Sequence, residues 1–528
     1  MKSLRRTLAI VAVVAPLAAV VAAAVLLTTS KAELNVSPTA LAQLKMPMGG
    51  GTVQNVQASI APQTQALPVQ MRGLKVWPTE KVGVGQKVTV TVTIKRPSWI
   101  SWLAGKTQQV TLTQKTPAAN LTSDFVTRKG TAPLQVHFTQ PVRKVSYAAL
   151  GSRPVTRELA QPSATVSIPE AAIAGTIRVS GATRGWETVK TAPVSWFPAG
   201  AKASAIAHPQ PGTSITPGTK ITITFSKPVD KVLGSSMPPV SPANAGSWQK
   251  LSSHSIRFNP TGYGYGLGSH VKVALPAGVQ LIGGEVSGSD PSGNWTVPNG
   301  STTRLQQLLA QLGYLPVNFD QQGSAPTTMA AQEQAAVSPP KGTFSWRYAN
   351  TPSSLQSQWG VGSYGELTKG AVMAFESEQG LTTDGIAGPV VWKALITAAL
   401  KHETSSFGYT YVYVTEGSPE SISVWHNGNT VVSGPVNTGI SAAPTALGTY
   451  AVYEHIPSGT MSGTNPDGST YHDPGIPDIS YFNGGDALHG FIRASYGFPQ
   501  SLGCVEMPYS EAGAVYPYTP IGTIVQVA

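Results

Sequence analysis

An alternating run of apolar and polar residues constrains the fold of this chain more than any other feature. From Lys87 to Ile94 the sequence reads K-V-T-V-T-V-T-I, with an aliphatic side chain at every second position. Because successive side chains of a strand point to opposite faces, this period of two predicts a half-buried antiparallel strand. Only 12% of the 528 residues are charged, while 54 are Gly and 43 are Pro. This composition favours a multidomain, mainly β protein.

A repeated segment indicates two copies of one β-module. The sequence F-T-Q-P-V-R-K-V at 138–145 matches F-S-K-P-V-D-K-V at 225–232. Each copy follows an alternating strand and precedes a short strand that ends in proline. The repeat therefore predicts two immunoglobulin-like β-sandwiches, over residues 72–198 and 199–299.

The N-terminus predicts a membrane helix over residues 1–30. Basic residues in the first six positions precede an uncharged, mostly aliphatic stretch from Thr7 to Ser30, and a spanning helix needs about 20 apolar residues. The basic residues orient the rest of the chain outward, so the expected location is the cell envelope outside the cytoplasm. A secretion signal cleaved within residues 20–24 is the alternative.

Residues 31–71 predict a flexible tether after this helix. The segment is rich in Gln, Ala, Pro, Ser and Gly and contains no aromatic residue. Such a segment buries too little apolar surface to fold alone.

Residues 300–402 change to helical periodicity and predict a small three-helix module. The first helix should begin at a Thr302 or Thr303 cap and end at Gly313. Its apolar face is formed by leucines at helical spacing, namely Leu305, Leu308, Leu309 and Leu312. A second helix is expected from about Thr368 to Gly380, and a third begins at Gly388-Pro389. A polar insertion, about 316–362, lacks periodicity and is expected to be a loop.

The single cysteine of the chain lies in a glycine turn close to a histidine. Cys504 belongs to S-L-G-C-V-E-M at 501–507, and His489-Gly490 lies fifteen residues before it. A thiolate is the nucleophile, and imidazole is the side chain suited to take its proton near neutral pH. The pair predicts acyl transfer through a thioester.

Four elements in order resemble the L,D-transpeptidase (YkuD-type) family of bacterial cell-wall enzymes. They are P-T-A-L-G-T-Y at 444–450, His489-Gly490, S-L-G-C-V at 501–505 and G-T-I-V-Q-V at 522–527. The resemblance implies that residues 403–528 form a β-rich catalytic domain. The segment L-T-T-D-G-I-A-G-P-V-V-W at 381–392 resembles a peptidoglycan-binding repeat, and the β-modules resemble the Ig-like spacers that precede such catalytic domains.

Two residues depart from the family pattern. Leu502 stands where a histidine is usual, and Glu506 stands where Arg or Asn is usual. His489 is therefore left as the base. A carboxylate near the thiol tends to raise the thiol pKa and to reject anionic substrate groups, although it can also favour an acceptor ammonium. Arg493 is expected to supply the missing positive charge.

The resemblance implies a ping-pong mechanism on peptidoglycan stems. Cys504 attacks the carbonyl of the third stem residue, and His489, oriented by a backbone carbonyl, passes the proton to the departing D-alanine. Backbone N–H groups around Gly503 hold the oxyanion, and Ser501 supports the loop. The amine of a second stem then resolves the thioester, giving a 3→3 cross-link. The residues expected to contact the substrate are Arg493, Glu506, Leu502, Gly490 and, on a flap within 454–483, Tyr471, His472 and Tyr481.

Other functions stay open at this stage. Hydrolysis of the thioester would make the protein an L,D-carboxypeptidase, and the two departures also fit a non-catalytic wall-binding scaffold. A zinc site built from His455, His472, His489 and Cys504 has no compact ligand spacing, so no metal and no cofactor are expected. The net charge of +11 lacks the Lys/Arg cluster that tracks nucleic acid and suits anionic wall polymers. The expected partners are peptidoglycan stems and glycan, the membrane through the N-terminal helix, and carbapenem β-lactams as covalent inhibitors.

Overall fold

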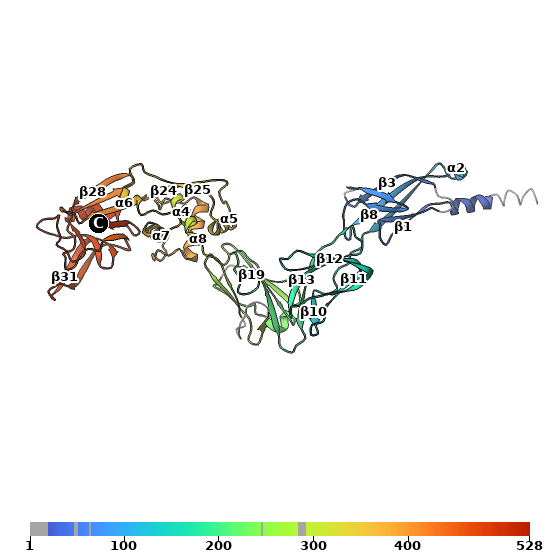
Figure 1. The fold of residues 1–528 in the computed structure, drawn as a ribbon, viewed down its shortest axis with the longest axis horizontal. Helices are drawn as coiled ribbons and strands as arrows, with labels where there is room; N and C mark the ends of the chain where they lie inside the picture. Colours follow the sequence, from blue (N-terminus) through green and yellow to red (C-terminus); the bar gives the residue numbers. More distant parts are fainter. Residues whose placement is uncertain (1–19, 47–50, 63–64, 244–245, 283–291) are drawn as a thin grey trace, which may run out of the picture. The chain divides into compact units, whose positions relative to one another are not determined.

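The computed structural model describes residues 20–46, 51–62, 65–243, 246–282 and 292–528. The chain divides into two compact units, Met1–Ile206 with Thr224–Pro228, and Ala207–Ile223 with Val229–Ala528. Strands dominate both units, and most of the helices gather between residues 302 and 401 (Figure 1). A mainly β, multidomain chain is thus what the structure contains.

The prediction of an N-terminal membrane helix is not supported by the structure. Residues 20–29 are helical, and no helix in the described part of the chain is long and apolar enough to cross a membrane. Residues 1–19 of the expected helix lie outside the described residues.

Residues 31–71 differ from the expected tether, because they contribute strands to two facing sheets. The sheets have the strand orders β1-β2-β6-β5 and β4-β3-β8-β9. The elements are β1 (Glu33–Val36), β2 (Ala42–Lys45), β3 (Thr52–Ile60), β4 (Gln65–Leu67), β5 (Val69–Arg72), β6 (Lys75–Pro78), β7 (Val82–Gly83), β8 (Lys87–Lys95), α2 (Ser98–Ala104) and β9 (Thr107–Lys115). The alternation in β8 is confirmed, since its aliphatic side chains are at most 1% exposed. They pack against Leu41 and Leu44, which gives the short early strands a core that their own composition does not indicate.

The two copies of the repeat continue differently in the structure. The first copy lies inside the long strand β11, and the second spans the end of β17 and the short helix α3. One sheet has the order β10-β15-β13-β11-β12, and the next two have the orders β19-β20-β17-β16-β22 and β18-β21-β23. The elements are β10 (Phe125–Arg128), β11 (Leu134–Ala149), β12 (Val155–Ile168), β13 (Gly175–Ala182), β14 (Glu187–Thr188), β15 (Ala192–Pro198), β16 (Ser204–His208), β17 (Ile221–Phe225), α3 (Val229–Leu233), β18 (Val240–Ser241), β19 (Gly246–Lys250), β20 (Ser255–Pro260), β21 (His270–Ala274), β22 (Gln280–Leu281) and β23 (Ser292–Thr296). The immunoglobulin-like assignment stays a prediction.

The helical module contains the three expected helices and a structured insertion. The first helix is capped by Ser301, whose Oγ accepts a hydrogen bond from the Arg304 N–H at 3.2 Å, rather than by a threonine. The insertion is not a plain loop. It contains an antiparallel strand pair, on which the ring centroids of Phe319 and Phe344 lie 5.0 Å apart. The elements are α4 (Thr302–Gln311), β24 (Val317–Gln321), α5 (Met329–Val337), β25 (Gly342–Trp346), α6 (Ser353–Gln356), α7 (Glu366–Glu378) and α8 (Pro389–Lys401).

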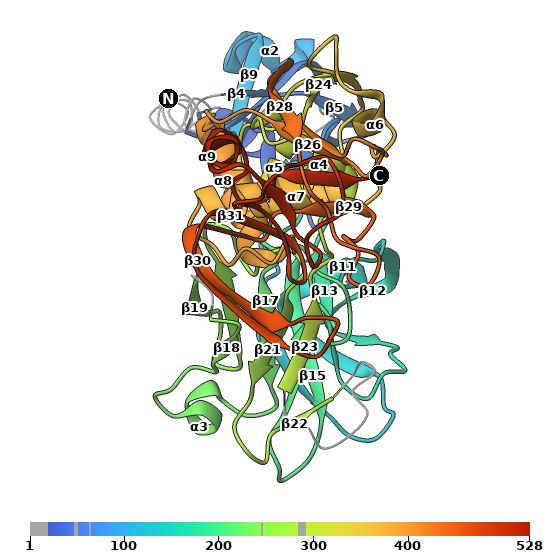
Figure 2. The same ribbon diagram turned by 90° about the vertical axis from the view of Figure 1, so that its left-hand side faces the viewer.

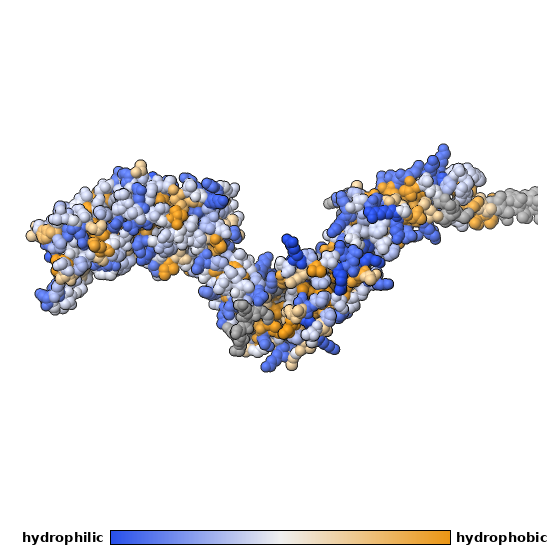
Figure 3. All heavy atoms as spheres, in the orientation of Figure 1, coloured by the Kyte–Doolittle hydropathy of each residue, from blue (hydrophilic) through white to orange (hydrophobic). Residues whose placement is uncertain are grey.

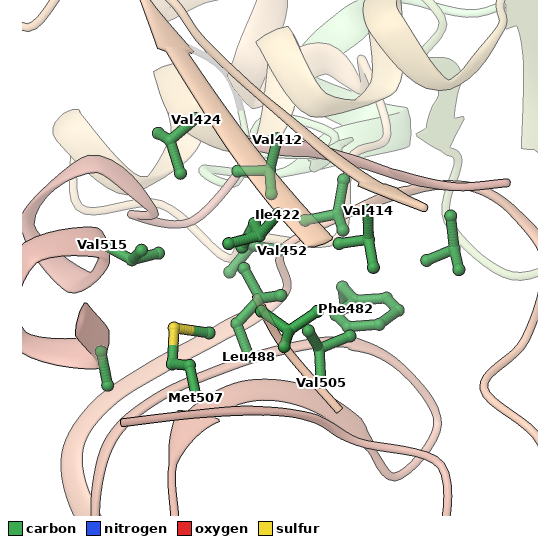
Figure 4. Close-up of a cluster of buried hydrophobic side chains, with 14 residues drawn as sticks. Val412, Val414, Ile422, Val424, Val452, Phe482, Leu488, Val505, Met507 and Val515 are labelled. Atoms are coloured by element: carbon green, nitrogen blue, oxygen red, sulfur yellow. The ribbon is translucent and has the colours of Figure 1, made fainter. Parts of the chain in front are cut away.

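The C-terminal domain is built from two sheets that face each other across an apolar core. Their strand orders are β28-β27-β26-β34-β29 and β30-β31-β32-β33. Val412 and Ile422 of the first sheet lie opposite Leu488 and Val505 of the second (Figure 4). The elements are β26 (Thr410–Thr415), β27 (Ser421–His426), β28 (Asn429–Pro435), β29 (Gly448–Ala451), β30 (Glu454–Thr464), β31 (Thr470–Asn483), β32 (Asp486–Gly490), β33 (Val505–Met507), α9 (Tyr509–Val515), η1 (Tyr516–Tyr518) and β34 (Ile524–Val527).

The helical module packs directly on the C-terminal domain. Leu367 and Met373 share one buried cluster with Tyr411 and Ile524. At the closest approach, a Cβ on Gly370 would lie 2.6 Å from the carbonyl oxygen of Gly522, so α7 needs a glycine there. The two parts therefore share a core rather than being joined by a free linker.

The expected flap is a long antiparallel hairpin, β30–β31, that extends from the C-terminal domain (Figure 2). Its tip, residues 464–470, is polar and lies on a hydrophilic part of the surface (Figure 3). The base of the hairpin is different, since Ile479 and Phe482 are buried there. The hairpin thus has an anchored base next to β32 and an exposed tip.

Candidate active site

Strand pairing brings the cysteine and the histidine to one face of the second sheet. β32 and β33 are parallel, with Leu488 opposite Val505 and His489 opposite Glu506. Leu488 and Val505 enter the apolar core, so the residues next to them in sequence face the other way. His489 in β32 and Cys504, the residue directly before β33, therefore lie on the same, outer face of this strand pair.

The Cys504 thiol is partly buried and sits close to a carboxylate. Its Sγ donates a hydrogen bond to the Gly485 carbonyl oxygen at 3.5 Å, and the side chain packs against the buried cluster that contains Ile479 and Ala487. The pKa of this thiol is raised to about 12, mainly by burial and also by the charges of Asp486 and Glu506, while the backbone hydrogen bond with Ala487 lowers it. The resting side chain is therefore a neutral thiol, which needs a base to become a nucleophile.

His489 is held in the form that a general base requires. The side chain is 2% exposed, and Nδ1 lies 3.0 Å from the Gly490 carbonyl oxygen. Since a carbonyl can only accept, Nδ1 carries the proton and Nε2 has the free lone pair. Burial lowers the pKa of His489, an effect that Gly490 and Glu506 oppose. The imidazole is therefore neutral near pH 7, oriented by a backbone carbonyl as the sequence predicts.

Glu506 and Arg493 form an ion pair with each other. Arg493 Nε donates to Glu506 Oε2 at 2.7 Å, and Nη2 donates to Oε1 at 2.8 Å. The guanidinium also lies 4.6 Å from the ring centroid of Phe491. Glu506 is only 5% exposed, and its hydrogen bonds raise the pKa of Arg493. Arg493 thus supplies a positive charge to the glutamate beside the site, and a contact of either residue with substrate stays a prediction.

The loop before the thiol is braced from within. Ser501 is buried, and its Oγ donates to the Cys504 carbonyl oxygen at 2.5 Å and accepts from the Gly503 N–H at 3.3 Å. Gly503 has a φ of +115°, and a Cβ there would lie 2.5 Å from Asp486 Oδ1, so the turn requires glycine. In the described hydrogen bonds the Cys504 N–H donates to no protein acceptor, whereas the Gly503 N–H donates to Ser501 Oγ. Leu502, next to Gly503, is partly exposed.

Residues 437–439, to which no sequence motif pointed, lie beside this loop. Asn437 pairs with Glu506 through both backbone hydrogen bonds at 2.9 Å, and the Gly439 N–H donates to Thr445 Oγ1 at 2.8 Å. Glu420, 2% exposed, accepts from the N–H and the hydroxyl of Thr438 at 2.6 and 2.7 Å. Thr445 belongs to the P-T-A-L-G-T-Y element, whose place beside the catalytic loop explains why it accompanies the cysteine motif.

The hairpin contributes aromatic side chains, although not all of the predicted ones. Tyr481 and Cys504 both pack against the cluster of Ile476, Ile479 and Ala487, and burial raises the pKa values of Tyr471 and Tyr481. Tyr453 stacks on Tyr481 with ring centroids 6.2 Å apart, and no sequence motif pointed to it. His472 follows Tyr471 in the strand, so it lies on the opposite face, where Nδ1 contacts Ser462 Oγ at 2.8 Å.

Gly490 turns away from the predicted substrate side. A Cβ at this position would lie 2.9 Å from Tyr509 Cδ1 and 3.1 Å from Ala512 Cβ. The glycine therefore allows α9 to approach β32 closely, which is a packing role.

The histidines of the hairpin do not converge on the thiol. His455 lies against Tyr516, with ring centroids 3.8 Å apart, and contacts Ser480 Oγ at 3.0 Å. Across the described ranges, no group of three or more His, Cys, Asp or Glu side chains is placed to hold a metal ion.

Comparison with known families assigns the C-terminal domain. Residues 410–527 match the L,D-transpeptidase catalytic domain (YkuD), and residues 352–395 match a peptidoglycan binding domain. The chain therefore contains both domains, as the sequence elements predict. A search of curated proteins found no match.

Solved L,D-transpeptidases are also similar to this chain. The enzyme from Mycobacterium smegmatis is 11% identical, over 62% of this chain and 100% of its own, with a TM-score of 0.20. The catalytic domain of the E. faecium enzyme is 23% identical, over 24% of this chain and 100% of its own, with a TM-score of 0.21. L,D-transpeptidase 3 from Mycobacterium tuberculosis is 12% identical, over 61% and 97%, with a TM-score of 0.21.

Proposed function

We propose that the L,D-transpeptidase catalytic domain of this chain uses Cys504 to form 3→3 cross-links between peptidoglycan stems, with release of D-alanine. One observation carries the proposal, namely that Cys504 and His489 share the outer face of the paired strands β32 and β33. A thiol and an oriented neutral imidazole on adjacent strands are the groups that covalent acyl transfer requires.

Acylation begins with a proton transfer and not from a preformed thiolate. The raised pKa of Cys504 and the lowered pKa of His489 both favour the neutral pair at rest. As Sγ attacks the carbonyl carbon between the third and fourth stem residues, Nε2 of His489 takes the thiol proton. The imidazolium then gives this proton to the leaving amine, and free D-alanine departs.

The loop geometry supports the intermediate. The Cys504 N–H is the donor closest in sequence to the attacking sulfur, and Ser501 fixes the Cys504 carbonyl on the other side of the residue. A fixed N–H that needs no reorganisation stabilises the negative oxygen of the tetrahedral intermediate. Ser501 is therefore a positioning residue, and the Cys504 backbone is part of the oxyanion site.

The second half-reaction decides between two products. When the side-chain amine of another stem attacks the thioester, the product is a cross-linked dimer. When water attacks, the product is a tripeptide and the enzyme is an L,D-carboxypeptidase. We favour the amine because the site carries negative charge and aromatic rings, which attract a protonated amine more than they order a water.

The remaining parts of the chain fit the same substrate. The module that matches a peptidoglycan binding domain packs against the catalytic domain, so glycan bound there stays near the thiol. Because peptidoglycan lies outside the cytoplasm, we place the protein in the extracytoplasmic cell envelope. The strained carbonyl of a carbapenem β-lactam should acylate the same thiol.

Mass spectrometry of products tests this function. The full chain is mixed with a purified disaccharide-tetrapeptide, beside a Cys504→Ala control. The expected product is a dimer that lacks one D-alanine and is absent from the control. Tripeptide alone would make the protein a carboxypeptidase. No product and no covalent carbapenem adduct would mean a wall-binding scaffold without catalysis.

A further inference from the structure

Asp486 occupies a central place beside the thiol that no sequence motif indicates. It is the first residue of β32, directly after the turn formed by Gly484 and Gly485. The carbonyl oxygens of this turn accept hydrogen bonds from the Tyr453 hydroxyl, at Gly484, and from Cys504 Sγ, at Gly485. A Cβ on Gly503 would lie 2.5 Å from Asp486 Oδ1. The carboxylate is therefore packed between the thiol loop and the base of the hairpin.

The carboxylate of Asp486 is fixed in place but not neutralised. Its Oδ2 accepts hydrogen bonds from the Ala446 N–H at 3.2 Å and from Asn483 Nδ2 at 3.3 Å. Among the ion pairs of the described residues, none involves Asp486, whose side chain is partly exposed. A partly buried carboxylate without a cation is unfavourable by itself, and its free oxygen is available to a ligand.

The other carboxylate near the thiol does not share this property. Glu506 is held by both nitrogens of the Arg493 fork and is 5% exposed. Of the two acidic groups whose charges act on Cys504, Asp486 and Glu506, only Asp486 has an unpaired charge. A cation at this site would therefore be received by Asp486.

Aromatic rings complete the surroundings of this charge. Tyr453 stacks on Tyr481, and Tyr481 and Cys504 pack against the same buried cluster of Ile476, Ile479 and Ala487. The Tyr453 hydroxyl donates a hydrogen bond to the Gly484 carbonyl oxygen, in the turn that precedes Asp486. The two rings and the carboxylate therefore belong to one connected cluster. Carboxylate oxygens and the faces of aromatic rings both attract an ammonium group.

We propose that Asp486, with the rings of Tyr453 and Tyr481, forms the subsite that receives the primary ammonium of the acyl acceptor. The proposal rests on the proposed function and names the residue that selects an amine over water. From the bound ammonium, one proton passes to Nε2 of His489. The nitrogen then forms the new C–N bond as the C–S bond breaks, and its second surplus proton goes to the departing sulfur. The products are an amide, a neutral thiol and an imidazolium that returns its proton to solvent.

Equilibrium binding tests the subsite without catalysis. Calorimetric titration of the full-length Cys504→Ala protein uses a tripeptide stem with a free side-chain amine and the same stem with that amine acetylated. We expect the free amine to bind at least about tenfold more tightly, and Asp486→Asn, which keeps the shape and both acceptor bonds, to abolish this preference. Asp467→Asn, the same charge change at the exposed hairpin tip, serves as the matched control. Equal binding of the two stems, or a preference that survives Asp486→Asn, overturns the proposal.

A kinetic measurement then assigns the subsite to the acceptor. A donor tetrapeptide with an acetylated side-chain amine acylates Cys504 but cannot accept, so acceptor stems are added separately and products are followed by mass spectrometry. In Asp486→Asn the acceptor KM should rise about tenfold relative to Asp467→Asn, and D-alanine release is followed in parallel so that any change in the first half-reaction is measured separately. An unchanged acceptor KM contradicts the proposal. Failure of the unaltered chain to release D-alanine instead contradicts the proposed function and leaves the binding result to decide the subsite.

Discussion

The two faces of the β32–β33 pair are made of the same backbone but carry opposite chemistry. On the inner face, Leu488, Val505 and Met507 are at most 1% exposed and contact only an apolar core. On the outer face, His489, Cys504 and Glu506 are all ionisable, and each has a specific polar partner. One face of this strand pair thus contributes to the apolar core, while the other face carries the candidate catalytic side chains.

This contrast explains how the outer face tolerates its electrostatic cost. The buried imidazole of His489 and the thiol of Cys504 oppose folding only at pH values where the unfolded chain would charge them, in acid for the imidazole and in alkali for the thiol, because burial disfavours both charged forms. The inner face offsets this cost by removing apolar side chains from water, at about 25 cal/mol per Å². Substitutions on the two faces should therefore have different effects. Those on the inner face should lower the stability of the domain, and those on the outer face should slow the chemical step.

The largest expected effect is on the outer face, at His489. In His489→Asn the amide can still donate to the Gly490 carbonyl oxygen, but the free lone pair of Nε2 is lost. Since a positioned general base contributes about 10²–10⁴-fold, the rate of acylation by a carbapenem should fall by that factor. Stopped-flow absorbance of the β-lactam measures it. A fall of less than about tenfold would show that another group takes the thiol proton.

The next effect is on the inner face, at Leu488. Leu488→Ala leaves a cavity in a fully buried position and should cost about 2–5 kcal/mol of stability. Hydrogen exchange of the amides in 486–490, followed by mass spectrometry on the full chain, reports the local loss. Val431→Ala, at an aliphatic position that is 38% exposed, is the control and should change little. If the folded Leu488→Ala protein lost acylation as strongly as His489→Asn, the separation of the two faces would be wrong.

The Arg493–Glu506 ion pair lies on the outer face but is expected to act on stability. Its loss should destabilise the domain less than Leu488→Ala does. Hydrogen bonds between charged groups contribute about 1.5–3 kcal/mol, and the Arg493 side chain is 30% exposed while that of Glu506 is 6% exposed. Arg493→Gln leaves a buried carboxylate without its cation, so it should destabilise β33 more than Glu506→Gln does. The same hydrogen-exchange measurement on both variants and on the double variant tests this order. Strictly additive losses would mean that the two side chains do not act as a pair.

The sequence predicts the parts of the site that are local and misses those that depend on distant strands. Cys504, His489 and Ser501 follow from a short motif, and the carbonyl that orients His489 belongs to the next residue. Tyr453 and Asp486 have no such signal, because their place beside the thiol depends on how the hairpin base and the Gly484–Gly485 turn pack.

The same reasoning applies to the fold. The alternation in β8 predicts a strand by itself. In contrast, the short strands of residues 33–72 look like a tether in composition, since the core that they join is supplied by β8. Hydropathy over residues 1–30 predicts a membrane helix. In the described part of the chain the helix ends at residue 29, and no described helix is long and apolar enough to cross a membrane.

The smallest expected effect is a pH dependence that reports the resting state of the outer face. Because burial lowers the pKa of His489 below its usual value of 6.5, the imidazole stays neutral until the pH falls below that lowered pKa. Acylation should therefore be flat around neutral pH and fall about tenfold per pH unit only in acid, where the base becomes protonated. The thiol, with a pKa of about 12, should add no rise below pH 9. Glu506→Gln should move the acid limb to lower pH, since the Glu506 charge raises the pKa of His489, whereas Leu488→Ala should leave the profile in place. A bell-shaped profile with a fall above pH 7 would instead indicate a thiolate–imidazolium pair at rest, and the neutral pair inferred from burial would be wrong.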